Sequence, residues 1–195
     1  MNSYILLAKL AVENYVKEGK KIETETDLAE QFSRSELAEM LKKRAGVFVT
    51  IEMDGELRGC IGTYLPTRIN IAEEIIRNAI AAATEDSRFG TIKAEELSHL
   101  SYTVYVLGEP EPVEDIKELN PKKFGIIVKT GPFTFTNQEN VTVDGTVPYK
   151  TGLLLPDLEG INTAEQQLAI ACKKGDINSE KEKIFIYRFT VEKYQ

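Results

Sequence analysis

The stretch that decides the fold runs from Gly46 to Leu65 and reads GVFVTIEMDGELRGCIGTYL. Apolar and polar residues alternate before and after Asp54-Gly55, a pattern typical of two antiparallel strands joined by a tight turn. The second strand holds a cysteine between two glycines, in the order Arg58-Gly59-Cys60-Ile61-Gly62. Glycine weakens a strand unless backbone, a partner or a ligand approaches closely. This hairpin is therefore the clearest structural element of the chain and its first candidate site.

Two registers of the hairpin are possible, and they place Cys60 on opposite faces of the sheet. A two-residue loop at Asp54-Gly55 pairs Met53 with Glu56 and turns Cys60 toward the apolar face. A three-residue loop, in which the glycine is left-handed, pairs Glu52 with Glu56 and turns Cys60 away. Because a one-residue slip moves every side chain to the other face, we expect the three-residue loop, which keeps the apolar residues together.

The three-residue register separates an apolar from a polar face. The apolar face carries Val47, Val49, Ile51, Leu57, Gly59 and Ile61. The polar face carries Thr50, Glu52, Glu56, Arg58, Cys60 and Gly62, with Phe48 across from Cys60. Arg58 and Cys60 then face the same way, opposite Ile61, about 7 Å apart along the strand. A guanidinium there favours the thiolate that a nucleophile requires, whereas a buried free cysteine acts only as a small apolar residue.

Composition limits the classes of function that the chain can serve. Its 195 residues suit one domain or two small lobes, and its net charge of −7 disfavours the phosphate contacts of a nucleic-acid module. Two cysteines, Cys60 and Cys172, and a single histidine, His99, are too few for a zinc ribbon or an iron–sulfur site. The amino-terminal residues predict an amphipathic helix rather than a leader peptide or membrane span, so we expect a cytoplasmic protein.

The rest of the chain mixes helices and strands without regular alternation, which predicts an α+β fold with largely antiparallel sheets. Helices are expected at residues 3–19, 33–46, 70–86, 93–100 and 162–175. Ser3 is the expected cap of the first helix, Ser33 with Glu36 forms a capping box, and Asn70 caps the third helix. Strands are expected at residues 101–110, 122–131, 132–137, 141–149, 152–157 and 183–194.

These stretches together resemble the AMMECR domain. The resemblance is carried by the hairpin, by EDSRFGTIKAEELSHLSYTVYVL at 85–107, by KKFGIIVKTG at 122–131 and by GLLLPDLEGINTAEQQLAIACKKGDI at 152–177. It covers nearly the whole chain, and its hallmark, Leu-Arg-Gly-Cys-Ile-Gly, matches here without a change. It implies one domain over residues 1–195, built of two unequal, interleaved lobes with a cleft between them.

The resemblance also implies a set of site residues and partners. The motif residues are Arg58, Gly59, Cys60, Ile61, Gly62, Asp86, Arg88 and Phe89. The implied partners are a Memo-like protein, similar to class III extradiol dioxygenases, and a radical S-adenosylmethionine enzyme; no metal or cofactor is expected for the domain itself. This chain lacks the tryptophan that many members carry near residues 173–183, and it has a long polar piece at 132–151.

Three functions compete on this evidence. The first is an accessory domain that binds a partner protein or a small anionic ligand, with Arg58 and Arg88 as anion contacts. The second is an enzyme that uses Cys60 as a nucleophile or redox thiol. The third, a nucleic-acid module, is disfavoured by the charge. For Asp86 and Arg88 a simpler role competes, a short ion pair that ties a helix end to the next segment.

Overall fold

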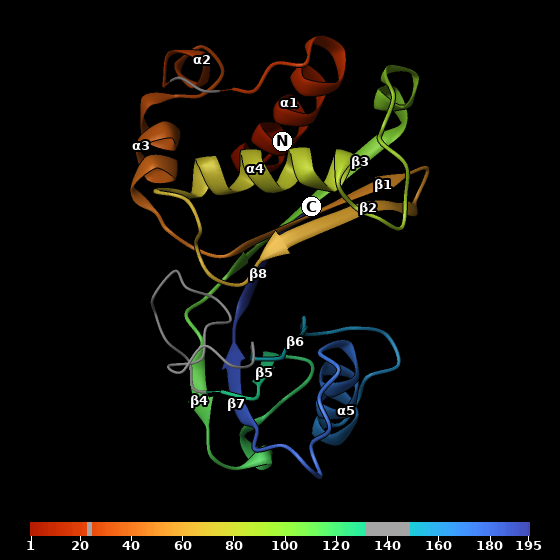
Figure 1. The fold of residues 1–195 in the computed structure, drawn as a ribbon. Coiled ribbons are helices and arrows are strands. Elements are labelled where there is room, and N and C mark those ends of the chain that lie inside the picture. Colours follow the sequence, from red (N-terminus) through yellow and green to blue (C-terminus); the bar gives the residue numbers. More distant parts are fainter. Residues whose placement is uncertain (23–24, 132–148) are drawn as a thin grey trace. The chain divides into compact units, whose positions relative to one another are not determined.

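The computed structural model describes residues 1–22, 25–131 and 149–195 (Figure 1). The strand expected at 132–137 and all but the last residue of the one at 141–149 lie outside these described residues. The described chain forms two compact units, residues 1–107 with 192–195, and residues 108–191. Each unit contains a four-stranded antiparallel sheet packed against helices, which confirms the α+β prediction.

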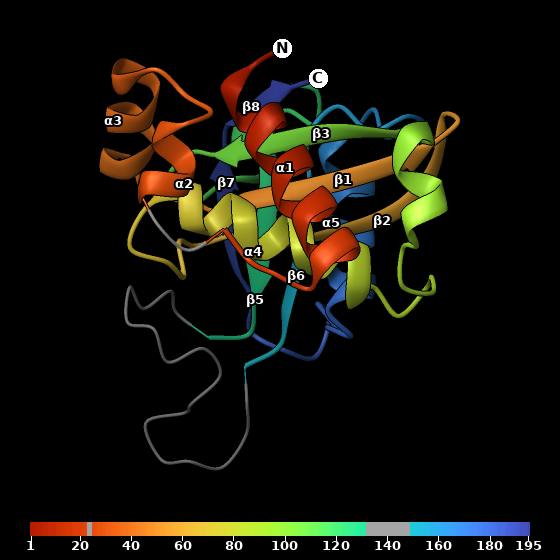
Figure 2. The same cartoon turned by 90° about the horizontal axis from the view of Figure 1, so that it is seen from above.

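The first unit is built on a sheet with the strand order β2-β1-β3-β8. Its strands are β1 (Val47–Met53), β2 (Glu56–Thr63), β3 (Leu100–Leu107) and β8 (Val191–Tyr194). Its helices are α1 (Ser3–Glu18), α2 (Glu25–Ala29), α3 (Arg34–Lys42), α4 (Ile71–Thr84) and the 3-10 helix η1 (Ala94–His99). Helices α1 and α4 cross over one face of this sheet (Figure 2).

The core of the first unit lies between that sheet face and the two helices. Val47, Val49 and Ile51 alternate along β1 and are fully buried, as are Ile75 of α4 and Leu7 of α1. Burying side chains of this size gains about 1.5–3 kcal/mol each, which is why the alternating face of the hairpin is fixed toward the helices. The helices thus decide which face of β2 belongs to the core.

Helix starts follow the sequence signals with one exception, whereas α3, expected to extend to residue 46, ends at Lys42. Asn2, not Ser3, caps α1, because its side chain accepts the amide of Tyr4 at 2.9 Å. The predicted capping box of Ser33 and Glu36 is present at α3, and Asn70 caps α4. Both Asn and Ser suit the cap position, so the choice between neighbouring residues is not decided by residue type.

The second unit has the strand order β4-β7-β5-β6. Its elements are β4 (Glu111–Val113), the 3-10 helix η2 (Ile116–Glu118), β5 (Gly125–Lys129), β6 (Thr151–Leu154), α5 (Ala164–Lys174) and β7 (Phe185–Phe189). The single closing strand expected at 183–194 is instead two strands, β7 and β8, one in each sheet. The break falls at Thr190, whose carbonyl accepts the amide of Gly108.

None of the described helices is long and apolar enough to cross a membrane.

Candidate functional site

The turn of the hairpin differs from the predicted one. Met53 pairs with Glu56, so the loop has two residues, and the expected three-residue loop is wrong. Asp54 and Gly55 both have positive φ, 52° and 86°. Two successive positive φ values give a turn whose twist matches that of the flanking strands, which favours Asp-Gly at these positions.

A bulge at Arg58 restores the apolar alignment that a two-residue loop would otherwise lose. Glu52 pairs with Leu57 and Ile51 with Gly59, so Arg58 is the extra residue of β2. Gly59 and Ile61 therefore share the core face of β1, as predicted. Leu57 does not, because it lies on the turn side of the bulge and is 43% exposed.

The bulge also changes which residues lie across from the cysteine. Thr50, not Phe48, is opposite Cys60, and Phe48 is opposite Gly62. The prediction that Phe48 lies across from Cys60 is therefore wrong, since it assumed an uninterrupted register. The assignment of Thr50, Cys60 and Gly62 to the face away from the core is confirmed by the pairing.

Close approach of other groups explains both glycines of the motif. A Cβ on Gly59 would lie 2.2 Å from the backbone carbonyl oxygen of Ala82 in α4. A Cβ on Gly62, on the other face, would lie 2.2 Å from Cγ of the Phe48 ring. These two glycines allow a helix to pack on one side of β2 and an aromatic ring on the other, so the fold alone requires them.

Arg58 is held by a segment that follows α4. Its Nε donates to Glu96 Oε1 at 2.7 Å, its Nη2 to Glu96 Oε2 at 3.2 Å, and its Nη1 to the Gly90 carbonyl at 2.8 Å. The hydrogen bond from Arg58 lowers the pKa of Glu96 from its ordinary value. Among the described residues, no hydrogen bond joins Arg58 to Cys60. The guanidinium therefore ties the bulge to the chain after α4.

Asp86 joins the cysteine to the second part of the motif. Its carboxylate is nearly buried and accepts the backbone N–H of Cys60 at 2.9 Å. It also accepts Nε and Nη2 of Arg88, at 3.0 and 2.7 Å. The Cys60 amide points away from β1, and no strand lies on that side because β2 is an edge strand. Asp86 therefore supplies the acceptor that a neighbouring strand would otherwise provide.

The predicted ion pair of Asp86 and Arg88 is present. Asp86 also accepts a hydrogen bond from the Cys60 backbone, which was not predicted. The hydrogen bonds from Arg88 hold the pKa of the Asp86 carboxyl well below its usual range. The sequence indicated the pair but not its bond to Cys60, because the two segments are brought together only by the packing of α4 on the sheet.

Arg88 is the cation bound to the carboxylate that holds the Cys60 amide. Its pKa is raised chiefly by the hydrogen bond to Asp86, and a thiolate at Cys60 adds to that effect. The side chain is 54% exposed although its partner is buried. Its guanidinium carbon lies 5.3 Å from the ring centroid of Phe89, within the range of a cation–π contact. Asp86, Arg88 and Phe89 therefore form one assembly next to the hairpin.

The cysteine itself is half-buried on the sheet. Thr50 Oγ1 donates to Cys60 Sγ at 3.2 Å from the facing strand. Burial raises the pKa of Tyr105, on β3 at the other side of β1, and a thiolate at Cys60 raises it further. Tyr105 was not predicted as part of the site, although its place in the alternation of β3 puts it on the face of Phe48, its pairing partner.

The remaining titratable candidates lie apart from this assembly. His99 is exposed at the hairpin turn, and its Nδ1 is 3.3 Å from Asp54 Oδ1. Cys172 is buried in the second unit, and burial raises its pKa. Within the described ranges, no group of three or more His, Cys, Asp or Glu side chains could hold a metal ion.

Comparison with known proteins identifies the family. Residues 5–194 of this chain match the AMMECR1 family. This chain belongs to the AMMECR1 family. A protein from Thermotoga maritima is 46% identical over 193 residues, which are 98% of this chain and 97% of that protein. The protein CA_C1420 from Clostridium acetobutylicum is 41% identical over 98% of this chain, which covers only 34% of that longer protein.

A solved structure has the same fold. The crystal structure of the uncharacterized protein PH0010 from Pyrococcus horikoshii matches with a TM-score of 0.75 and 29% sequence identity. The match covers 97% of this chain and 88% of the P. horikoshii chain. The hallmark glycines, the Asp86 assembly and the bulge thus belong to an AMMECR1 domain.

Proposed function

We propose that this AMMECR1 domain is an accessory binding domain that acts together with a Memo-like protein. Recognition of that partner, or of a small anionic ligand, takes place on the Cys60 surface, which consists of Phe48, Thr50, Cys60, Arg88 and Tyr105. Aromatic and arginine side chains are the residue types that contribute most at protein interfaces. An acidic chain with a local cation suits a protein or metabolite partner better than a nucleic acid.

The observation that carries this proposal is the way Asp86 holds Arg88. A buried carboxylate fixes the arginine with two hydrogen bonds while more than half of the arginine side chain remains exposed. Its Nη1 makes no hydrogen bond to any described residue and is available to an acceptor on a partner or ligand. It is also already ordered, which reduces the entropy lost on binding. The same carboxylate holds the Cys60 backbone, so the cation and the thiol keep a fixed relation.

Arg58 has a supporting role in this proposal. All three of its nitrogens are engaged by Glu96 and Gly90, and its side chain is only 14% exposed. It therefore maintains the bulge that separates Leu57 from the motif. Arg88 takes the part of anion contact that the sequence suggested for both arginines.

The identity of the partner rests on the family resemblance. A Memo-like protein and a radical S-adenosylmethionine enzyme are the implied companions of such domains. The C. acetobutylicum relative supports an accessory role, since this chain matches only about a third of its length and the domain there is part of a longer protein.

The test is a calorimetric titration of the domain with the Memo-like protein encoded in the same genome. Arg88→Glu reverses a central charge and is expected to weaken binding by at least about thirtyfold, the effect of losing a strong interface contact. Arg34→Glu, an exposed charge reversal at the start of α3, is the matched control and should leave the affinity unchanged. Absence of saturable binding, or equal effects of the two variants, would refute the proposal. Arg88→Ala, which introduces no charge beside Asp86, guards against a folding defect.

A second candidate function, catalysis by Cys60, is favoured by a separate observation. The hydroxyl of Thr50 donates to Sγ, and the carboxylate that holds the Cys60 amide also binds the guanidinium of Arg88. The measurement is the pH dependence of iodoacetamide alkylation in the wild type and in the Arg88→Ala, Arg58→Ala and Cys60→Ser forms. A titration midpoint near about 8.5 that Arg88→Ala does not move removes the nucleophile hypothesis and leaves the binding domain.

A further inference from the structure

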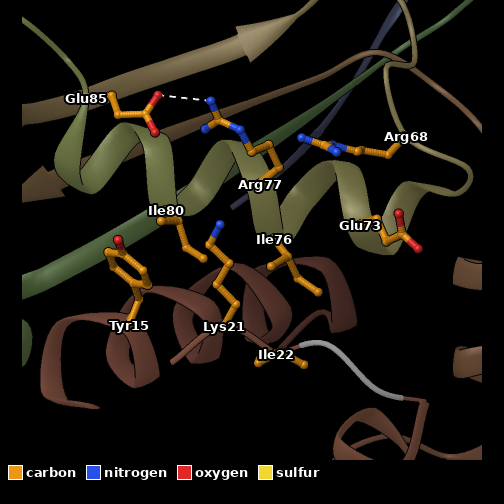
Figure 3. A pocket seen from close by; sticks show the side chains of 9 residues that line it. All are labelled: Tyr15, Lys21, Ile22, Arg68, Glu73, Ile76, Arg77, Ile80 and Glu85. Carbon is orange, nitrogen blue, oxygen red and sulfur yellow. Dashed lines mark hydrogen bonds and ion pairs between the residues drawn. The ribbon is translucent and has the colours of Figure 1, made fainter. Parts of the chain in front are cut away.

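The first unit contains a cavity that the Cys60 surface does not include. Its volume is about 470 Å³, within the usual range for small-molecule sites (Figure 3). It lies between α4 and the chain at the end of α1. Figure 3 labels the residues that line it.

The apolar part of the cavity is rigid. Ile76 and Ile80 project from the same side of α4, one turn apart, and are 8% and 4% exposed. Because their remaining surface is held in the core, they form a fixed wall of the cavity. Tyr15 and Ile22, from the end of α1 and the chain that follows it, complete the apolar lining. An apolar wall with a few polar groups is the usual composition of a ligand pocket.

Three cations line the same cavity, and among the described residues only one of them has an anionic partner. Arg77 pairs with Glu85 at 3.0 Å. Lys21 and Arg68 form no ion pair with any residue that the structure describes. Figure 3 shows the Arg68 guanidinium pointing toward Arg77, whereas the Glu73 carboxylate is turned away at the start of α4. Cations that line one cavity repel each other, so an anion bound there would relieve the repulsion.

The position of Arg68 is fixed by a buried carboxylate. Glu74, fully buried in the first turn of α4, accepts the backbone amides of Thr67 at 2.6 Å and Arg68 at 2.8 Å. It also accepts the hydroxyls of Thr63 and Thr67. The loop that carries Arg68 is therefore held in place, and the guanidinium extends from a defined backbone position although its side chain reaches solvent.

We infer that this cavity binds a small organic anion that consists of an apolar body and one acidic head group. The head group contacts Lys21 and Arg68, and the body packs on Ile22, Ile76 and Ile80. The charge balance of the lining, three cations against two carboxylates, gives it a positive excess in a chain whose net charge is −7. This site is separate from the Cys60 surface and does not depend on the function proposed for it.

The test titrates the full chain with three probes that differ in charge and in apolar content. Binding is detected from changes in the amide chemical shifts. The probes are 4-phenylbutyrate, its neutral amide, and inorganic phosphate. Saturable shifts centred on residues 68 and 76–80 are expected for 4-phenylbutyrate. The neutral amide lacks the head group and phosphate lacks the body, so each is expected to bind at least about tenfold more weakly.

Matched variants decide whether the lining cations are responsible. The double variant Lys21→Gln with Arg68→Gln is expected to weaken 4-phenylbutyrate binding by at least about tenfold. Lys17→Gln, an exposed lysine of α1 outside the cavity, removes a charge from the same region and should change nothing. The inference is overturned by absence of saturable binding, by equal binding of acid and amide, or by a double variant that binds like the wild type. Thermal melts of all variants confirm that the exposed substitutions leave the fold intact.

Discussion

The two faces of β2 carry different kinds of residues within one short motif. On the core face, Gly59 and Ile61 pack against α4 and the buried residues of β1, and Gly59 leaves no room for a side chain. On the other face, Cys60 is half-buried, bonded to Thr50, and accompanied by an ordered but exposed Arg88. Successive residues of β2 therefore alternate between packing in the core and forming the surface around Cys60.

This difference shows that a family hallmark is not a list of site residues. Gly59, Gly62 and Arg58 each have a structural partner that accounts for them: the α4 backbone, the Phe48 ring and Glu96. Of the motif residues, Cys60 and Arg88 remain as the candidates for binding or chemistry. The following experiments test that division, beginning with the face where the largest effect is expected.

Substitution of the core-face glycine should disrupt the fold most. Gly59→Ala places a Cβ 2.2 Å from a backbone oxygen of α4, which cannot move without moving the helix. We expect a loss of about 3 kcal/mol or more in the free energy of unfolding, measured by urea denaturation. Gly90→Ala is the matched control, because a Cβ there meets nothing within 4 Å. A Gly59→Ala protein as stable as Gly90→Ala would contradict the assignment of this face to the core.

Removal of the Asp86 carboxylate should have the next largest effect. Asp86→Ala leaves the Cys60 amide without its acceptor and frees Arg88, at a cost of about 1–3 kcal/mol in stability. Asp86→Asn keeps an acceptor for the amide and loses the ion pair, so it should cost less than Asp86→Ala. Equal costs for the two variants would show that the bond to Cys60 contributes nothing.

The same residue predicts a pH dependence. Because its pKa is lowered in the folded state, Asp86 stabilises the protein at pH values above its unfolded pKa of about 3.9. That stabilisation is lost as the pH falls from there through the lower folded-state pKa. The difference in unfolding free energy between the wild type and Asp86→Asn should therefore be constant near neutrality and shrink below about pH 4. A difference in unfolding free energy that does not change with pH would show that the ion pair of Asp86 and Arg88 does not stabilise the fold.

The ion pair of Arg58 and Glu96 should show a smaller, measurable coupling. Both side chains are mostly buried and joined by two hydrogen bonds. A double-mutant cycle with Arg58→Gln and Glu96→Gln is expected to give a coupling of about 1–2 kcal/mol in unfolding free energy. Additive effects of the two substitutions would show that Arg58 is free to contact a ligand, as the sequence first suggested.

Substitution of the cysteine should affect stability least. Cys60→Ser keeps the size of the side chain, its Thr50 partner and the backbone bond to Asp86. The change in unfolding free energy is expected to stay within about 1 kcal/mol. A larger loss, comparable with that of Asp86→Ala, would mean that Cys60 is a core residue and that the two faces do not differ as described.

Much of this division could be predicted from sequence because it follows from period-two alternation. Because Val47, Val49 and Ile51 are buried, the apolar pattern places Gly59 and Ile61 on the same core face, with a longer loop or with a bulge. The turn itself was predicted wrongly, since a bulge corrects the register just as a longer loop does, and its only local sign is the polar Arg58. Each solution places one extra residue in the hairpin, so the alternation of apolar residues does not distinguish them.

The assembly around Cys60 could not be predicted because its members are distant in sequence. Asp86 and Glu96 reach β2 only through the packing of α4 and the turn that follows it. The pairing of Asp86 with Arg88 was accessible from their spacing, whereas the choice of which arginine accompanies the thiol was not. Long polar side chains near a strand can take several partners, and tertiary packing selects among them.

The most direct test of the account is the effect of a bulky label on Cys60. In a Cys172→Ala background Cys60 is the single cysteine, and N-ethylmaleimide then modifies the Cys60 surface alone. We expect the unlabelled protein and Cys60→Ser to bind the Memo-like partner equally well in a calorimetric titration. The labelled protein should bind at least about tenfold more weakly, since the label occupies a central contact. A labelled protein that binds as tightly as the unlabelled one would contradict the proposal that this surface is the binding face.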